Sequence, residues 1–274
     1  WLKASWLKQW HFKMSSLGFA MGLHVSVLCS YGLLPAGGLT VSPLLDVRMD
    51  RAVHSFESAS PCNFPRINPD EIHSREELEK IAAGRPVILK SSDRVWNLAS
   101  LTRVLGDIPV LVDNGRHDEG RHKKRMTIQH YLEDLHKDEH NLHIFQAHPH
   151  LLEGSIASVH AARPLAVLEA VAERPIFSMG FPGTATYFHN HAETWQTLLL
   201  GRKAWFLAPP KPMHVEYKLE KTNPCEWLAS AEGIENATPP TGGPPPNAQF
   251  CVQQAGETLF FPKLWWHATC NLGP

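Results

Sequence analysis

Three histidines in the second half of the chain have the spacing of a metal site. His189 and His191 are two residues apart at the end of a short strand-like run, and His267 follows a second such run that ends at Pro262. Residues at this spacing lie on the same face of a β-strand, because side chains alternate along it. Neutral imidazole is a good ligand for iron, zinc, copper and nickel. We therefore predict that His189, His191 and His267 bind one metal ion; the alternative is three hydrogen-bonded histidines of the core.

Both histidine groups lie inside longer motifs. Each motif starts with a glycine and ends beyond a histidine, at residues 183–191 and 256–271. The first reads Gly-x5-His-x-His and the second Gly-x5-Pro-x4-His-x3-Asn, and both resemble the motifs of cupins. Residues 201–210, Gly-Arg-Lys-Ala-Trp-Phe-Leu-Ala-Pro-Pro, and the string Trp-Trp-His at residues 265–267 narrow the resemblance to the JmjC (cupin-like) Fe(II)/2-oxoglutarate oxygenases. The resemblance covers roughly residues 62–274.

The resemblance implies a mainly β (α+β) fold: a double-stranded β-helix, or cupin jelly-roll barrel, with helices flanking its N-terminal part. It implies Fe(II) and 2-oxoglutarate as cofactors. Lys203 matches the lysine that pairs with the distal carboxylate of 2-oxoglutarate, Thr186 the residue whose hydroxyl bonds the same carboxylate, and Asn271 a residue lining the pocket. A buried lysine needs a counter-charge. The alternatives are a surface lysine at 203 and a turn residue at 271.

Three positions depart from the family pattern. Leu264 stands where the second motif has glycine, and the first motif lacks its glutamate at the usual spacing, although Glu193 lies two residues after His191. His191 stands where most JmjC enzymes carry a carboxylate, so Fe(II) would keep both positive charges. Glu193 could supply a nearby carboxylate, or it could be an exposed or ion-paired residue.

Two functions of different kinds stay open at this point. The first is a 2-oxoglutarate-dependent oxygenase that hydroxylates a protein side chain. The second is a catalytically inactive lumenal adaptor or binding protein on the same scaffold, which the histidine at position 191 favours. A third, weaker hypothesis is a thiol dioxygenase or isomerase of the wider cupin class. Fold alone does not decide among them.

Size and charge limit the class of protein and of partner. The length of 274 residues predicts one domain with appendages. The formal net charge is −1. Without a basic stripe we expect no nucleic-acid partner, and the resemblance favours a protein substrate or partner. Most of the 17 histidines lie in polar segments such as residues 136–143, which we interpret as solvated surface.

The N-terminal segment differs in kind from the rest. Residues 14–45 contain no Asp, Glu, Lys or Arg and follow three lysines, which is typical of a signal peptide or signal anchor. We interpret residues 1–45 as this leader, where any membrane contact would occur, and residues 46–61 as a linker. A sequon at Asn236 and a possible pair of Cys62 with Cys251 suit the endoplasmic reticulum lumen, where JmjC proteins with His-x-His are also found. Sequence alone cannot fix the disulfide connectivity.

The remaining patterns predict the elements that position the site. Residues 74–83 are strong helix formers with Ser74 as N-cap, residues 101–105 a short helix capped by Ser100, and residues 126–135 an amphipathic helix with Thr127 as a possible cap. Prolines and glycines in 211–249 predict an insertion between the two motifs, with one short helix near 223–230. We assign four tryptophans to the barrel core rather than to substrate contacts: Trp195, Trp205, Trp265 and Trp266. The final barrel strand, after the distal histidine, is expected to be missing.

Overall fold

The structure, a computed structural model, describes the backbone of residues 22–28 and then residues 51–55, 57–58, 62–90, 96–113, 123–134, 142–147, 176–210, 223–230, 244–245 and 247–272. Most of the insertion, including the sequon at Asn236, and most of the segment interpreted as a leader lie outside these residues. Within the described residues, no helix is long and apolar enough to cross a membrane.

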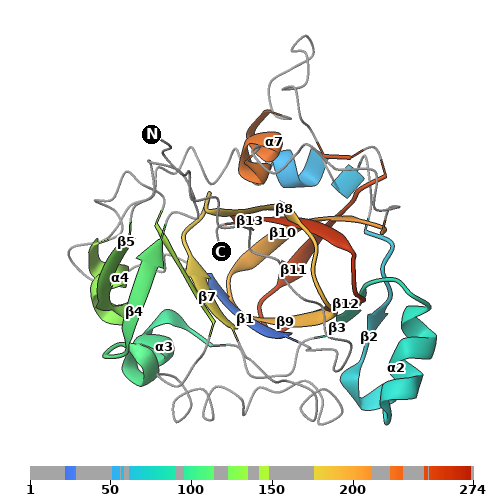
Figure 1. The fold of residues 1–274 in the computed structure, drawn as a ribbon, viewed down its shortest axis with the longest axis horizontal. Coiled ribbons are helices and arrows are strands. Elements are labelled where there is room, and N and C mark those ends of the chain that lie inside the picture. Colours follow the sequence, from blue (N-terminus) through green and yellow to red (C-terminus); the bar gives the residue numbers. More distant parts are fainter. Residues whose placement is uncertain are drawn as a thin grey trace, which may run out of the picture.

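Two β-sheets face each other and enclose the interior of the domain (Figure 1). The large sheet has the order β2-β3-β12-β9-β1-β7-β6-β4-β5, and the small sheet the order β11-β10-β13-β8. This confirms the predicted mainly β, jelly-roll class of fold. The strands are β1 (Gly22–Leu28), β2 (Arg66–Ile67), β3 (Val87–Leu89), β4 (Pro109–Asp113), β5 (Lys123–Thr127), β6 (His143–Ala147), β7 (Ile176–Gly180), β8 (Ala185–His189), β9 (Thr194–Leu200), β10 (Arg202–Ala208), β11 (Gln249–Gln254), β12 (Thr258–Phe261) and β13 (Trp266–Leu272).

Strand β1 occupies the position between β7 and β9 and runs parallel to both. Its residues belong to the segment interpreted above as a leader. If residues 22–28 were removed with a leader, they could not form β1. The two assignments of these residues therefore exclude each other. Within the described residues β13 is the last strand along the chain, and β1 lies in the middle of the large sheet.

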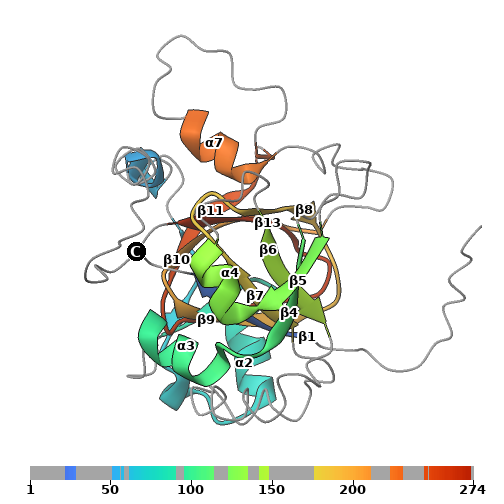
Figure 2. The same ribbon diagram turned by 90° about the vertical axis from the view of Figure 1, so that its left-hand side faces the viewer.

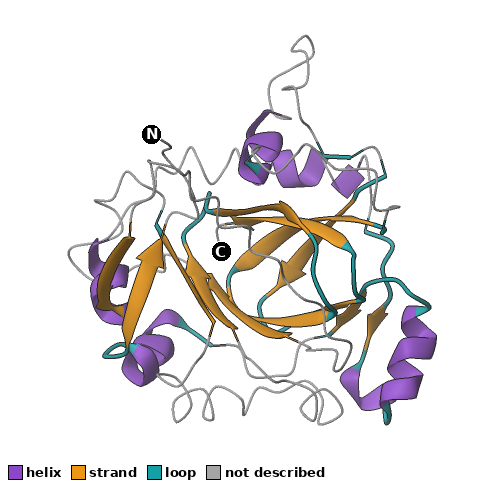
Figure 3. Ribbon diagram, viewed as in Figure 1, coloured by secondary structure: helices purple, strands orange, loops and turns teal. Residues whose placement is uncertain are grey.

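Helices cover the outer faces of both sheets (Figure 3). They are η1 (Pro69–Glu71), α2 (Arg75–Ala82), α3 (Leu98–Leu105), α4 (Ile128–Asp134) and α7 (Pro224–Ser230). Both views place α7 on the side of the small sheet that faces away from the large sheet (Figure 1, Figure 2). Residues 51–55 and 57–58 are also helical, and Ala52 and Val53 are buried in the same cluster as α7, so this part of the expected linker packs on the domain.

The helix caps agree with the sequence predictions at two positions and differ at a third. The Ser74 hydroxyl accepts from the Glu77 backbone N–H at 3.2 Å, and the Thr127 hydroxyl from that of His130 at 3.1 Å. The prediction of Ser100 as a cap was wrong. Helix α3 starts earlier, with Asn97 as N-cap and Ser100 as its reciprocal partner in a capping box, because residues 98–100 already pack as a first turn.

Alternation along the strands gives the small sheet an apolar outer face and a partly polar inner face. Outward residues of β10 and β13, such as Phe206 and Cys270, join a cluster with Trp227 and Leu228 of α7. Every second residue points the other way, into the interior. Since that interior face carries His267, the packing of α7 outside fixes the strand that presents the histidine inside.

Candidate metal centre

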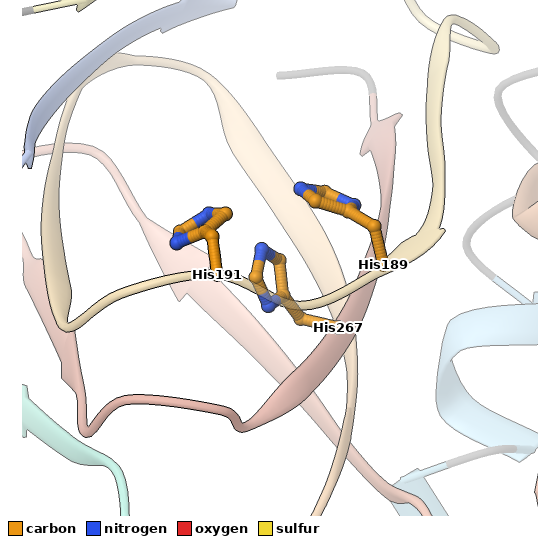
Figure 4. A group of neighbouring side chains, drawn as sticks. All are labelled: His189, His191 and His267. Atoms are coloured by element: carbon orange, nitrogen blue, oxygen red, sulfur yellow. The ribbon is translucent and has the colours of Figure 1, made fainter. Parts of the chain in front are cut away.

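The three predicted histidines meet at one end of the interior. His189 is the last residue of β8, His191 lies in the loop that follows, and His267 is the second residue of β13, directly opposite His189 in the strand pair. Ring centroids are separated by 4.2 Å for His189 and His267, 4.7 Å for His191 and His267, and 5.3 Å for His189 and His191. The rings face one another (Figure 4), and one ligating atom from each lies within 4.8 Å of the others.

Backbone carbonyls fix the tautomer of all three rings. Nδ1 of His189 is 2.7 Å from the carbonyl oxygen of Tyr187, Nδ1 of His191 is 2.7 Å from that of Ala192, and Nδ1 of His267 is 2.9 Å from the oxygen of residue 265. A carbonyl oxygen only accepts, so each Nδ1 carries the hydrogen. The lone pair of each neutral ring is then on Nε2, and the carbonyl partners orient these atoms as outer-shell groups do in metal sites.

Burial favours the neutral form of His189 and His191 before any ion binds. The pKa of His189 is lowered to about 4, chiefly by burial and also by the nearby His191. Burial also lowers the pKa of His191. Protons therefore compete little for these nitrogens near neutral pH. Three neutral Nε2 donors suit a divalent first-row metal ion, and because such bonds are roughly 2.0–2.2 Å long, only small ring movements would bring the nitrogens into coordination distance.

Glu193 is not part of this group. Its carboxylate pairs with Arg75 of α2, which also binds Glu79. Among the residues that the structure describes, the group that could hold an ion consists of the three histidines alone. Among these residues, the site therefore has no carboxylate, unlike most JmjC enzymes. Glu193 is instead ion-paired, which is one of the two alternatives considered for it from the sequence.

Lys203 lies on the same inner face as His267. Along the pair of β10 and β13, it is four residues away from the position of His267. Lys203 is paired with Asn271, and Leu207 with His267, in the antiparallel pair of β10 and β13, and opposed residues share a face. Burial lowers the pKa of Lys203 to about 7. Its Nζ lies 5.8 Å from the ring centre of Trp205, whose ring is in turn 6.1 Å from that of His267. Trp205 is thus a core residue, as predicted, and its ring lies near both the lysine and His267.

A bulge brings Thr186 to the interior. It precedes His189 by three positions, which would place the two on opposite faces of a regular strand. The register between β8 and β13 shifts by one residue, so that His267 opposes His189 and Thr269 opposes Thr186. Because opposed residues share a face, both Thr186 and His189 face inward.

Asn271 also lies on this face, and its side chain has a structural contact. Its Nδ2 donates to the Thr184 hydroxyl at 2.6 Å, and that hydroxyl donates to the Phe181 carbonyl. A Cβ on Gly180 would lie 2.3 Å from the Thr184 oxygen and 2.5 Å from the Asn271 nitrogen. Asn271 thereby joins the end of β13 to the turn before β8, four residues along β13 from His267.

The sequence reading missed Gln196, a polar residue inside the interior. It opposes Leu259, which packs in the interior cluster with Trp205 and Phe261, so its side chain faces the same space. Gln196 is 2 % exposed, and its Nε2 has no hydrogen-bond partner among the described residues. The contrasting Gln253 is fully satisfied: it accepts from the Trp205 ring and donates to two backbone carbonyls. An amide in the first half of β9, a strand that continues as three leucines, is the signal that could have identified Gln196.

Two disulfides hold the strands around the site. Cys62 and Cys251 are bonded, with Cα atoms 4.9 Å apart, which confirms the pair considered from the sequence. Cys225 and Cys270 form a second bond that was not predicted, with Cα atoms 5.1 Å apart. The second bond ties α7 of the insertion to β13, three residues beyond His267.

Comparison with known proteins agrees with this geometry. Residues 73–274 match the model of the cupin-like domain. The human JmjC domain-containing protein 8 is 31% identical over 212 residues, which are 72% of this chain and 75% of the relative. The chain belongs to the cupin-like family of JmjC proteins. The rat protein of the same name is 37% identical over 100 residues, 36% of this chain and 34% of the relative. The Caenorhabditis briggsae protein named bifunctional arginine demethylase and lysyl-hydroxylase psr-1 is 32% identical over 108 residues, 35% of this chain and 26% of that protein.

One departure of this JmjC protein from the cupin motif has a visible backbone consequence. Leu264 has φ of 67°, in the left-handed region that glycine adopts without steric cost. Its backbone N–H donates to the His191 carbonyl at 2.9 Å. The turn between β12 and β13 therefore holds the loop that carries His191. Leucine keeps this bond at the cost of a strained conformation.

Proposed function

We propose that this JmjC protein is a mononuclear Fe(II), 2-oxoglutarate-dependent oxygenase that hydroxylates a side chain of a protein substrate. The observation that carries the proposal is a single inner face with three converging histidines at one level and a buried lysine, Lys203, deeper inside. The name of the psr-1 relative, a demethylase and lysyl-hydroxylase, supports a protein substrate.

Each residue has a separable task in this proposal. His189, His191 and His267 would hold the metal through Nε2, with their Nδ1–H groups already bound to backbone carbonyls. When bound, the metal would supply activation of O2, the oxidant, and 2-oxoglutarate would be the co-substrate that is oxidised to succinate and CO2 alongside the protein side chain. Lys203 would bind the far carboxylate of 2-oxoglutarate through a charge-assisted hydrogen bond, which is stronger than a neutral one. The Thr186 hydroxyl would reach the same carboxylate.

Gln196 adds a further donor for the oxo acid. Its Nε2 is buried on the inner face and has no partner among the described residues. An unpaired buried donor costs free energy, and an oxygen atom of a bound oxo acid would remove that cost. The buried Trp205 ring would separate the oxo acid from the core.

The test is consumption of 2-oxoglutarate by iron-loaded protein, with His267→Ala as the variant that removes the metal. Lys203→Met should weaken 2-oxoglutarate binding at least tenfold while iron affinity stays within about threefold, because the lysine would bind the oxo acid and is not a ligand of the metal. If the wild-type protein neither binds nor consumes 2-oxoglutarate, and Lys203→Met alters no ligand affinity, the oxygenase proposal is wrong.

A second candidate is a binding protein on the same scaffold that does not turn over. The histidine at position 191, where most JmjC enzymes have a carboxylate, favours it. His191→Asp separates the two candidates. If chemistry was lost only through this ligand, the variant should gain 2-oxoglutarate consumption; an enzyme adapted to three imidazoles should lose activity.

We further propose that the protein works in the lumen of the endoplasmic reticulum. Two disulfides support an oxidising compartment, since such bonds are rare where glutathione keeps thiols reduced. The apolar, uncharged stretch at residues 14–45 and the sequon at Asn236 agree with this. The test is a mobility shift after glycosidase treatment of protein from secretory membranes, with Asn236→Gln as control. Protein found reduced and without glycan in the cytosol would contradict the proposal.

A further inference from the structure

The loop after β8, which carries His191, is held from outside the barrel. Glu193, two residues after His191, forms an ion pair with Arg75, the first residue of α2. Arg75 also binds Glu79 one turn further along, with Nε 2.7 Å from the carboxylate oxygen. Its guanidinium lies over the Phe260 ring, 5.4 Å from the ring centre. Three contacts therefore fix the position of this cation.

These contacts place Arg75 on the opposite side of β12 from the histidines. Phe260 packs in the cluster outside the large sheet, with residues of α2 and α3, whereas its neighbour Phe261 packs inside. The Phe261 ring is 4.5 Å from that of His267. Arg75 therefore draws Glu193 toward the outer face, while the adjacent His191 faces inward.

Glu193 would otherwise be within reach of the metal. Two residues span at most about 7 Å of backbone, and a glutamate side chain covers most of that distance. Carboxylate together with histidines is the common ligand set for non-haem iron. A glutamate released from its partner near a divalent ion would therefore be a strong additional ligand.

We propose that Arg75 determines the ligand set of the metal centre by withholding Glu193 from it. The ion pair keeps the site a set of three neutral imidazoles, although a carboxylate lies two residues away along the chain. This inference rests on the metal-binding part of the proposed function and is independent of turnover. Carboxylate ligands suit manganese and imidazoles suit cobalt, nickel and zinc, so Arg75 also sets which ion the centre prefers.

The experiment measures Co(II) and Mn(II) binding by the whole chain, with the visible spectrum of bound Co(II) as the direct report on its ligands. The variant combines Arg75→Gln with Lys263→Gln, because Lys263 also acts on the charge of Glu193. We expect an altered Co(II) spectrum and at least tenfold tighter Mn(II) binding. Adding Glu193→Gln should restore the wild-type spectrum and affinity. Glu193→Gln alone should leave both unchanged.

The chain offers a matched control in a second ion pair. Arg66 pairs with Glu257, in the turn at the other end of β12 from the histidines. Arg66→Gln should lower the melting temperature, as loss of Arg75 also does, but leave the Co(II) spectrum unchanged. Arg75→Lys, which retains a charge without the forked guanidinium, provides a second and milder variant that should give an intermediate spectrum.

Two outcomes would overturn the proposal. One is a Co(II) spectrum that stays the same in the double variant Arg75→Gln, Lys263→Gln. The other is an altered spectrum that persists after Glu193→Gln is added, since the effect would then not pass through that carboxylate. If the three histidines are not the metal site, the His267→Ala variant should bind Co(II) as tightly as the wild-type protein. This result is distinguishable from both outcomes above.

Discussion

Binding of 2-oxoglutarate should be coupled to proton uptake by Lys203. Burial lowers the pKa of this lysine to about 7 in the unliganded protein. A carboxylate beside the ammonium group stabilises its charged form and raises the pKa again. With full protonation in the complex, uptake should be about 0.9 proton per ligand at pH 8, about 0.5 at pH 7 and about 0.1 at pH 6. Affinity should accordingly fall by nearly tenfold per pH unit above pH 7 and be nearly level below it.

Isothermal titration calorimetry measures this uptake directly. The protein is loaded with Mn(II), so that binding occurs without turnover, and titrated with 2-oxoglutarate in buffers of different ionisation enthalpy. Lys203→Met should bind more weakly and take up no proton at any of the three pH values. Wild-type binding at pH 8 without proton uptake would refute the reasoning, because the lysine would then be charged before the ligand arrives or would not contact it.

Three further predictions concern stability. Gln196→Met should raise the free energy of unfolding of the unliganded protein by about 1–2 kcal/mol, because it removes an unpaired buried donor, and should abolish most of the thermal shift caused by 2-oxoglutarate; a lower melting temperature would contradict this. The double variant Cys225→Ser, Cys270→Ser should lose about 2–4 kcal/mol in denaturant titrations, and an unchanged midpoint would count against the bond. Leu264→Gly should gain about 1 kcal/mol by relieving a left-handed leucine while keeping its N–H bond to the metal-site loop; a loss in the same titration would show that the side chain itself stabilises the turn.

Local chemistry made part of this structure predictable. The serine before a run of helix formers acts over a few residues, and its prediction as a cap is confirmed. The three histidines come together as predicted, but the expectation that His189 and His191 share one face of a strand was wrong, because β8 ends at His189 and His191 lies in the loop. The cap of α3 was placed three residues too late, because Asn97 and Ser100 are both good capping residues and only the packing of the first turn distinguishes them.

Long-range pairing accounts for what the sequence could not supply. Nothing near Cys225 indicates that it meets Cys270, because the contact depends on how the insertion crosses the small sheet. The same holds for Glu193, whose partner lies 118 residues earlier in the chain. Thr186 faces inward only because of a bulge in β8, and alternation along a strand cannot reveal a bulge.

The disulfide between Cys62 and Cys251 has a consequence for the order of events during synthesis. Its cysteines are 189 residues apart, so at ordinary ribosomal rates the first waits about 10–40 s for the second. Cys225 emerges before Cys251, and its own partner Cys270 emerges last. Between the emergence of Cys225 and that of Cys251, the thiol available to Cys62 from this set is the wrong one. A correct product therefore requires either that Cys62 stays reduced until β11 is made or that a mixed pair is exchanged afterwards, and the yield of native protein should depend on disulfide-isomerase activity rather than on oxidation alone.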